Sequence, residues 1–171
     1  MLSDQAQVAK LIRKELKEKY PSIKFVVRSR SFTGGDDVNI DYINGVPHDE
    51  INKMVQKYKG GSFDGMTDMY NYDYDKTGPT AKYIFANRNI TEDIREKAKN
   101  KIAKDFGIVD INDENEWQKK FDAWSSVMVH RYLFNRTILN DGTIEDNGKI
   151  IDWSRNREKS RSITKSYIDK G

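Results

Sequence analysis

The chain has 171 residues, of which 36% are apolar and 33% are charged, with no cysteine and a formal net charge of +3 at pH 7. A chain of this length supports one sizeable hydrophobic core, and the lack of cysteine excludes a disulfide frame and a cysteine-based zinc site. The first residues lack the apolar run of a signal peptide, and no segment is apolar over the length that crosses a bilayer, so we expect a soluble cytoplasmic protein.

The first half of the sequence predicts two helices and three strands from the spacing of its apolar residues. The helices are expected over residues 1–20 and 48–59, and the strands over residues 22–32, 38–43 and 81–90. A Gly-Gly turn separates the first two strands, which therefore form a hairpin with one apolar and one polar face. In the third strand, Tyr83 and Phe85 lie on one face and Ile84 and Ala86 on the other.

The second half predicts helices. Residues 92–106 repeat an apolar side chain every fourth position and end at Gly107. Residues 112–139 predict one further helix with an aromatic stripe that marks it as a core element. Its members are Trp117, Phe121, Trp124, Met128 and Tyr132. The order α-β-β-α-β-α-α predicts an α+β fold, in which a small antiparallel or mixed three-stranded sheet carries helices on one face. We expect one domain over residues 1–153 and a basic tail over residues 154–171.

An acidic, tyrosine-rich segment occupies residues 62–75. It holds four aspartates, no base and three tyrosines in fourteen positions. Three interpretations stay open: a divalent metal site, although the spacing does not match a calcium loop; a mimic of nucleic acid that occupies the nucleic-acid groove of another protein; and a structural turn. The expected partner-binding residues are Asp64, Asp68, Tyr70, Tyr72, Asp73 and Asp75.

Basic side chains gather in two places. Lys24, Arg28 and Arg30 share the polar face of the first predicted strand, and the tail holds six Lys or Arg against two acids. Basic groups for phosphates beside aromatic rings for bases are typical of a sheet that binds single-stranded nucleic acid, although a merely solvated face has the same pattern. The expected nucleic-acid-binding residues are Lys24, Arg28, Arg30, Arg155, Arg157 and Arg161.

No pattern of residues defines an active site. The phosphate-binding glycine patterns and the Gly-x-Ser-x-Gly nucleophile motif are absent. Histidine beside arginine can cleave RNA, so His48 or His130 with the strand arginines is one catalytic hypothesis, and Asp64 with Asp68 around a metal is another. If the protein is an enzyme, a ribonuclease is expected; no cofactor is predicted beyond a possible divalent metal.

Residues 24–72 resemble the large polyvalent protein-associated domains of phages, plasmids and other mobile elements. They combine a basic strand, a Ser-Phe-x-Gly-Gly turn, an alternating strand, a Gly-x-Pro turn, a helix and a Phe-Asp-Gly-Met-x-Asp motif. The matching positions are Ser31, Phe32, Gly34, Gly35, Gly45, Pro47, Phe63, Asp64, Gly65, Met66 and Asp68. No catalytic residue transfers with this resemblance.

The resemblance implies a genomic setting rather than a reaction. Small proteins of mobile elements often counter host defences, so the leading hypothesis is an anti-CRISPR inhibitor in the host cytosol that binds an effector nuclease or its guide RNA. The alternatives are a nuclease that cleaves guide RNA and a nucleic-acid-binding accessory protein of plasmid transfer or phage replication.

Overall fold

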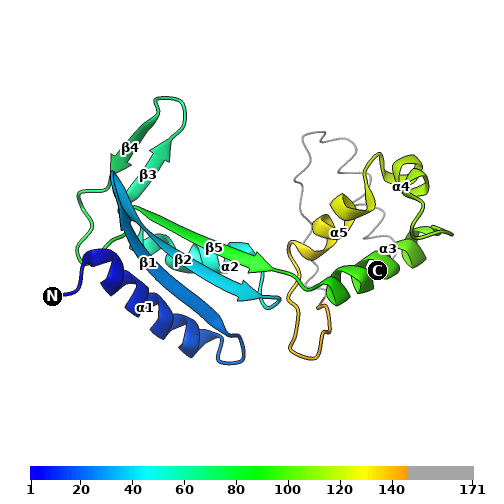
Figure 1. Ribbon diagram of the computed structural model, residues 1–171, viewed down its shortest axis with the longest axis horizontal. Coiled ribbons are helices and arrows are strands. Elements are labelled where there is room, and N and C mark those ends of the chain that lie inside the picture. The colour runs from blue at the N-terminus through cyan, green and yellow to red at the C-terminus, as the bar shows by residue number, and fades with distance from the viewer. Residues whose placement is uncertain (146–171) are drawn as a thin grey trace. The chain divides into compact units, whose positions relative to one another are not determined.

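The computed structural model of the protein describes residues 1–145, which form two compact units (Figure 1). Unit 1 comprises Met1–Asn89, and unit 2 begins at Ile90. Each unit has its own cluster of buried apolar side chains. The expectation of one domain over residues 1–153 stays a prediction. The basic tail, with Arg155, Arg157 and Arg161, lies outside the described residues.

Unit 1 is built on a mixed three-stranded sheet, so the predicted α+β class is confirmed. The strands are β1 (Phe25–Phe32), β2 (Gly35–Ile43) and β5 (Tyr83–Asn89), in the spatial order β1-β2-β5. β1 and β2 are antiparallel and joined by a turn in which Gly34 adopts a φ of 94°, a conformation that favours glycine. β2 and β5 are parallel, because the chain between them crosses over through a helix.

Two helices pack on one face of this sheet. α1 (Asp4–Lys19) runs alongside β1 and buries Val8, Ile12 and Leu16, while α2 (His48–Val55) packs against β5 (Figure 1). A short 3-10 turn, η1 (Gln56–Tyr58), follows α2. The sheet residues that face the helices alternate along each strand and are buried. They are Val27, Val38, Ile40, Tyr42, Ile84 and Ala86.

A second, two-stranded sheet lies within the connection between β2 and β5. β3 (Gly61–Asp64) and β4 (Met69–Tyr72) form an antiparallel hairpin that extends beyond the main sheet (Figure 1). A Cβ on Gly61 would lie 2.0 Å from the backbone oxygen of Asn71, so only glycine allows the two strands to approach this closely. This hairpin forms most of the acidic segment, for which the sequence predicted no strands.

Unit 2 is helical in its described part. α3 (Glu92–Phe106), α4 (Glu114–Phe121) and α5 (Ser125–Leu133) share one cluster of buried side chains, which includes the fully buried Trp117 of α4. The single helix predicted over residues 112–139 is therefore two helices. Asp122 takes a left-handed φ of 54° and ends α4, and the side chain of Glu114 then accepts a hydrogen bond of 2.8 Å from the backbone N–H of Ser125 at the start of α5. Because of this break, Trp124 is 56% exposed instead of joining the predicted core stripe.

Candidate nucleic-acid interface

The face of the main sheet opposite α1 and α2 carries the residues that could bind a ligand. Strand register places these side chains in rows that run across the three strands. One row contains Arg30, Asp37 and Tyr83 from β1, β2 and β5. The next contains Arg28, Asn39 and Phe85. Each of these two rows thus presents a cation, a polar side chain and an aromatic ring in that order.

Aromatic rings form a continuous strip along one side of this open face. The ring centroid of Tyr83 lies 6.1 Å from that of Phe85 and 6.5 Å from that of Phe32, and both pairs are stacked. Phe85 is 48% exposed and Phe32 42% exposed. Rings that remain this accessible on a folded sheet offer flat surfaces on which another ring can stack.

The β3–β4 hairpin extends the aromatic strip. Tyr70 meets Tyr83 edge to face at 5.6 Å and Tyr72 at 4.8 Å between centroids. The hydroxyl of Tyr70 donates a hydrogen bond of 2.7 Å to the backbone oxygen of Lys82, which fixes the hairpin against the start of β5. Burial is the main cause of a raised pKa for Tyr70, aided by its tyrosine neighbours, so this hydroxyl stays protonated as a donor at neutral pH.

The ammonium group of Lys82 lies at the centre of this tyrosine cluster. Its Nζ is 5.0 Å from the ring centroid of Tyr70, 5.5 Å from that of Tyr83 and 5.9 Å from that of Tyr72. It also donates a hydrogen bond of 2.8 Å to the backbone oxygen of Gly34. These contacts hold a positive charge beside the half-buried rings of Tyr70 and Tyr83 and the exposed ring of Tyr72, where a phosphate could reach it.

The two strand arginines predicted to bind nucleic acid both lie on the open face, but their surroundings differ. Arg30 is 2.5 Å from a carboxylate oxygen of Asp37, whose side chain is only 3% exposed. Arg28 is 4.0 Å from Asp41, and its own side chain is 76% exposed. Lys24 is exposed just before β1. Arg30 is therefore engaged within the protein, whereas Arg28 is available to an approaching anion.

The aspartates of the acidic segment shape the hairpin. Asp64 accepts hydrogen bonds of 2.9 Å from the backbone N–H of Met66 and from the hydroxyl of Thr67. The first of these bonds is the main cause of the lowered pKa of Asp64. Asp68 has a left-handed φ of 52° in the same turn, and Asp73 accepts a hydrogen bond from the N–H of Asp75. These contacts support the structural-turn interpretation, while the role of the segment in partner binding stays a prediction.

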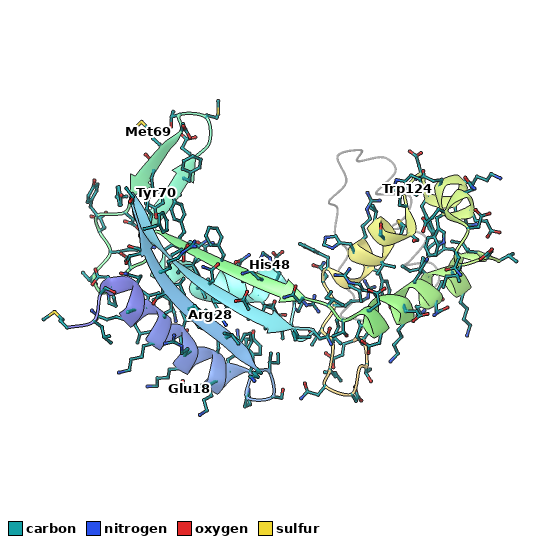
Figure 2. The ribbon with its side chains drawn as sticks, viewed as in Figure 1. Glu18, Arg28, His48, Met69, Tyr70 and Trp124 are labelled. Carbon is teal, nitrogen blue, oxygen red and sulfur yellow. The ribbon has the colours of Figure 1, made fainter. Side chains whose placement is uncertain are left out.

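Within unit 1, His48 is not brought together with Asp64 and Asp68. His48 begins α2 and lies 3.6 Å from Asp49. Asp64 and Asp68 flank the turn between β3 and β4, and Met69, which begins β4, lies far from His48 in Figure 2. His130 lies in unit 2 on α5, where burial, aided by Arg95, lowers its pKa. Within residues 1–145, no group of three or more His, Asp or Glu side chains is arranged to hold a metal ion.

Sequence patterns predicted only part of this candidate interface. It placed the arginines on the polar face of β1 and Tyr83 with Phe85 on one face of β5. It did not identify Lys82 or Asn39, because their significance depends on the crossover that brings β5 beside β2. The alternation of Tyr70 and Tyr72 was the available signal for β4.

Comparisons with known proteins identify the N-terminal part of the chain. The profile of a family described as Large polyvalent protein associated domain 29 matches residues 3–103, which extends beyond the residues 24–72 that carried the resemblance. A search of curated proteins and a search of solved structures gave no match. No helix among residues 1–145 is both long enough and apolar enough to cross a membrane.

Proposed function

The chain belongs to the large polyvalent protein associated domain 29 family, which associates it with phages and other mobile elements, and we propose that its open sheet face binds single-stranded nucleic acid. The observation that carries this proposal is the exposed row of Arg28, Asn39 and Phe85. Such a row offers a charge for a phosphate, an amide for a base edge and a ring for a base face.

Single strands fit this face better than a duplex. The bases of a duplex are stacked on one another, so their faces cannot reach Phe85 or Phe32, whereas unpaired bases can lie on exposed rings. The charge of the open face also favours single strands over a duplex. Arg30 is paired with Asp37, so of the two strand arginines only Arg28, which is 4.0 Å from Asp41, remains available to a phosphate. Stacking then contributes more than phosphate attraction.

The proposal is tested by fluorescence anisotropy with a labelled single-stranded oligonucleotide of about twelve residues and with the matching duplex. The single strand is expected to bind more tightly than the duplex. Its affinity should fall only shallowly with salt, with a slope of log K against log salt of roughly −1 to −2, as contacts to about two phosphates predict. Equal binding of the duplex, or no binding of either, would overturn the proposal.

We also propose a counter-defence role, in which the bound strand is the guide RNA of a CRISPR effector nuclease. The association of the family with phages supports this setting. The acidic hairpin would then face a basic surface of the nuclease. The partner residues proposed for this contact are Asp64, Asp68, Tyr70, Tyr72, Asp73 and Asp75.

This role is tested by mixing the protein with guide RNA, both free and loaded in an effector nuclease, with and without magnesium. Intact RNA together with lost cleavage of the target is the expected result. Shortened RNA would instead identify a ribonuclease, and unchanged target cleavage would reject the counter-defence role. Replacing all four aspartates of the acidic segment by asparagine should weaken binding to the nuclease but not to a free oligonucleotide.

A further inference from the structure

We infer that the row of Arg28, Asn39 and Phe85 reads one nucleotide and that Asn39 selects bases that carry an exocyclic amino group. This inference rests on the proposed binding of single strands. It names the residue that determines base preference and the chemical group that this residue recognises.

The register of the strands gives Asn39 the central place. Asn39 is the neighbour of Arg28 on one side and of Phe85 on the other. Adjacent strands are about 4.8 Å apart, so the two outer residues are separated by roughly 10 Å across the sheet. That separation matches a nucleotide whose base lies on the ring of Phe85 and whose phosphate reaches Arg28. The edge of the base then lies over Asn39.

A hydrogen bond to Asp37, in the neighbouring row, fixes the orientation of the side-chain amide of Asn39. Its Nδ2 donates a hydrogen bond of 2.9 Å to Oδ1 of Asp37. A carboxylate can only accept, so the amide must turn its NH2 group toward Asp37. Asp37 itself is 2% exposed and is held by Arg30 through its other oxygen. The Oδ1 of Asn39 is therefore the end of the amide turned away from Asp37, where it can accept a hydrogen bond from a ligand.

An acceptor at this position distinguishes the bases. Adenine, cytosine and guanine each carry an exocyclic amino group that can donate to Oδ1, whereas uracil and thymine carry carbonyl oxygens instead. A uracil carbonyl facing Oδ1 would place two acceptors against each other. We expect an oligonucleotide of adenosine to bind about 5- to 10-fold more tightly than one of uridine, which corresponds to the loss of one hydrogen bond.

The test compares oligo(A) with an oligomer of purine riboside of the same length, which differs only by the missing amino group. The same pair is measured on two variants, Asn39→Leu and Asn87→Leu. Asn87 is a matched control because its Nδ2 also donates to a carboxylate, Asp41, at 3.0 Å. Its row contains Val26 in place of an arginine and no aromatic ring.

The unaltered protein and the Asn87→Leu variant should bind oligo(A) about 5-fold or more tightly than the purine oligomer, and Asn39→Leu should bind both equally. Equal binding of the two oligomers to the unaltered protein would overturn the inference, and this comparison needs no variant to fold. The proposed function would survive that result if Phe85→Ala still weakened binding. A failure of every oligomer to bind would overturn both.

Discussion

Two arginine–aspartate pairs on one sheet face allow a direct test of how burial changes the strength of an ion pair. Arg30 and Asp37 are 2.5 Å apart, and the Asp37 side chain is 3% exposed. Arg28 and Asp41 are 4.0 Å apart, and the Asp41 side chain is 38% exposed. Both pairs join β1 to β2, so they differ mainly in separation and burial. We predict that the Arg30–Asp37 pair is the stronger of the two.

The magnitude follows from the surroundings of each carboxylate. Arg30→Ala would leave the buried Asp37 with the hydrogen bond from Asn39, and the loss of a hydrogen bond to a charged group costs about 1.5–3 kcal/mol. The cost is below the 3–5 kcal/mol of a fully buried pair, because the Arg30 side chain is 70% exposed. The exposed Arg28–Asp41 pair should contribute about 0–1 kcal/mol.

Double-mutant cycles measure these two values. Each cycle uses the parent, an Arg→Ala variant, an Asp→Asn variant and the double variant, with the free energy of unfolding taken from urea titrations at unchanged m. The expected coupling energy is about 1.5–3 kcal/mol for Arg30–Asp37 and below about 1 kcal/mol for Arg28–Asp41. Equal coupling energies, or a larger one for Arg28–Asp41, would refute the argument that Asp37 engages Arg30.

Three further predictions concern the two units separately. Trp117→Ala should destabilise unit 2 by about 3–5 kcal/mol in urea unfolding, because the ring is fully buried; a loss below about 1 kcal/mol would contradict its place in the core. Burial acts to raise the pKa of Glu114, but hydrogen bonds from Ser125 outweigh it and the folded pKa is lowered from 4.5. The contribution of ionised Glu114 to the free energy of unfolding is therefore complete above pH 4.5 and is lost as the pH falls through the folded pKa. Glu114→Gln should have a lower free energy of unfolding than the parent at pH 7, and the two values should converge at low pH. Gly61→Ala should disrupt the β3–β4 hairpin, because the new Cβ would lie 2.0 Å from the backbone oxygen of Asn71. The expected result is faster amide hydrogen exchange confined to the hairpin. Unchanged exchange would contradict this prediction.

Regular periodicity made much of the fold predictable. The helix over residues 1–20, the Gly-Gly hairpin and the strand at residues 81–90 each have a clear apolar repeat, and the structure contains α1, β1 with β2, and β5 at these places. One feature could not be predicted from periodicity. The stripe over residues 112–139 continues through Asp122, whose left-handed backbone ends α4 although the side chains keep helical spacing.

The open face of the sheet was predictable in its parts but not in its assembly. Alternation placed Arg28 on one face of β1 and Phe85 on one face of β5. Their common row depends on the parallel pairing of β2 with β5, which is a contact between residues distant in sequence. Local patterns carry no information about such a register, and the central place of Asn39 therefore emerged only from the structure.

The electrostatic difference between the two arginines also leads to a prediction for the proposed binding of a single strand. Arg28→Ala should weaken the binding of a single strand and reduce its salt slope by about 0.7, because one phosphate contact is lost. Arg30→Ala should leave that slope unchanged, because Arg30 is already paired with Asp37. A reduced slope for Arg30→Ala and not for Arg28→Ala would reverse the roles assigned to these residues.

The most direct test of the open face as a binding surface compares Phe85→Ala with Ile43→Ala in the anisotropy assay. Both side chains are apolar, both point to the open face, and they are 48% and 61% exposed. Stacking of one base contributes about 1–3 kcal/mol, so Phe85→Ala should weaken binding of a single strand roughly 5- to 150-fold while Ile43→Ala changes it less than about 2-fold. Equal affinities for Phe85→Ala and the parent would contradict the assignment of this face to single-stranded nucleic acid.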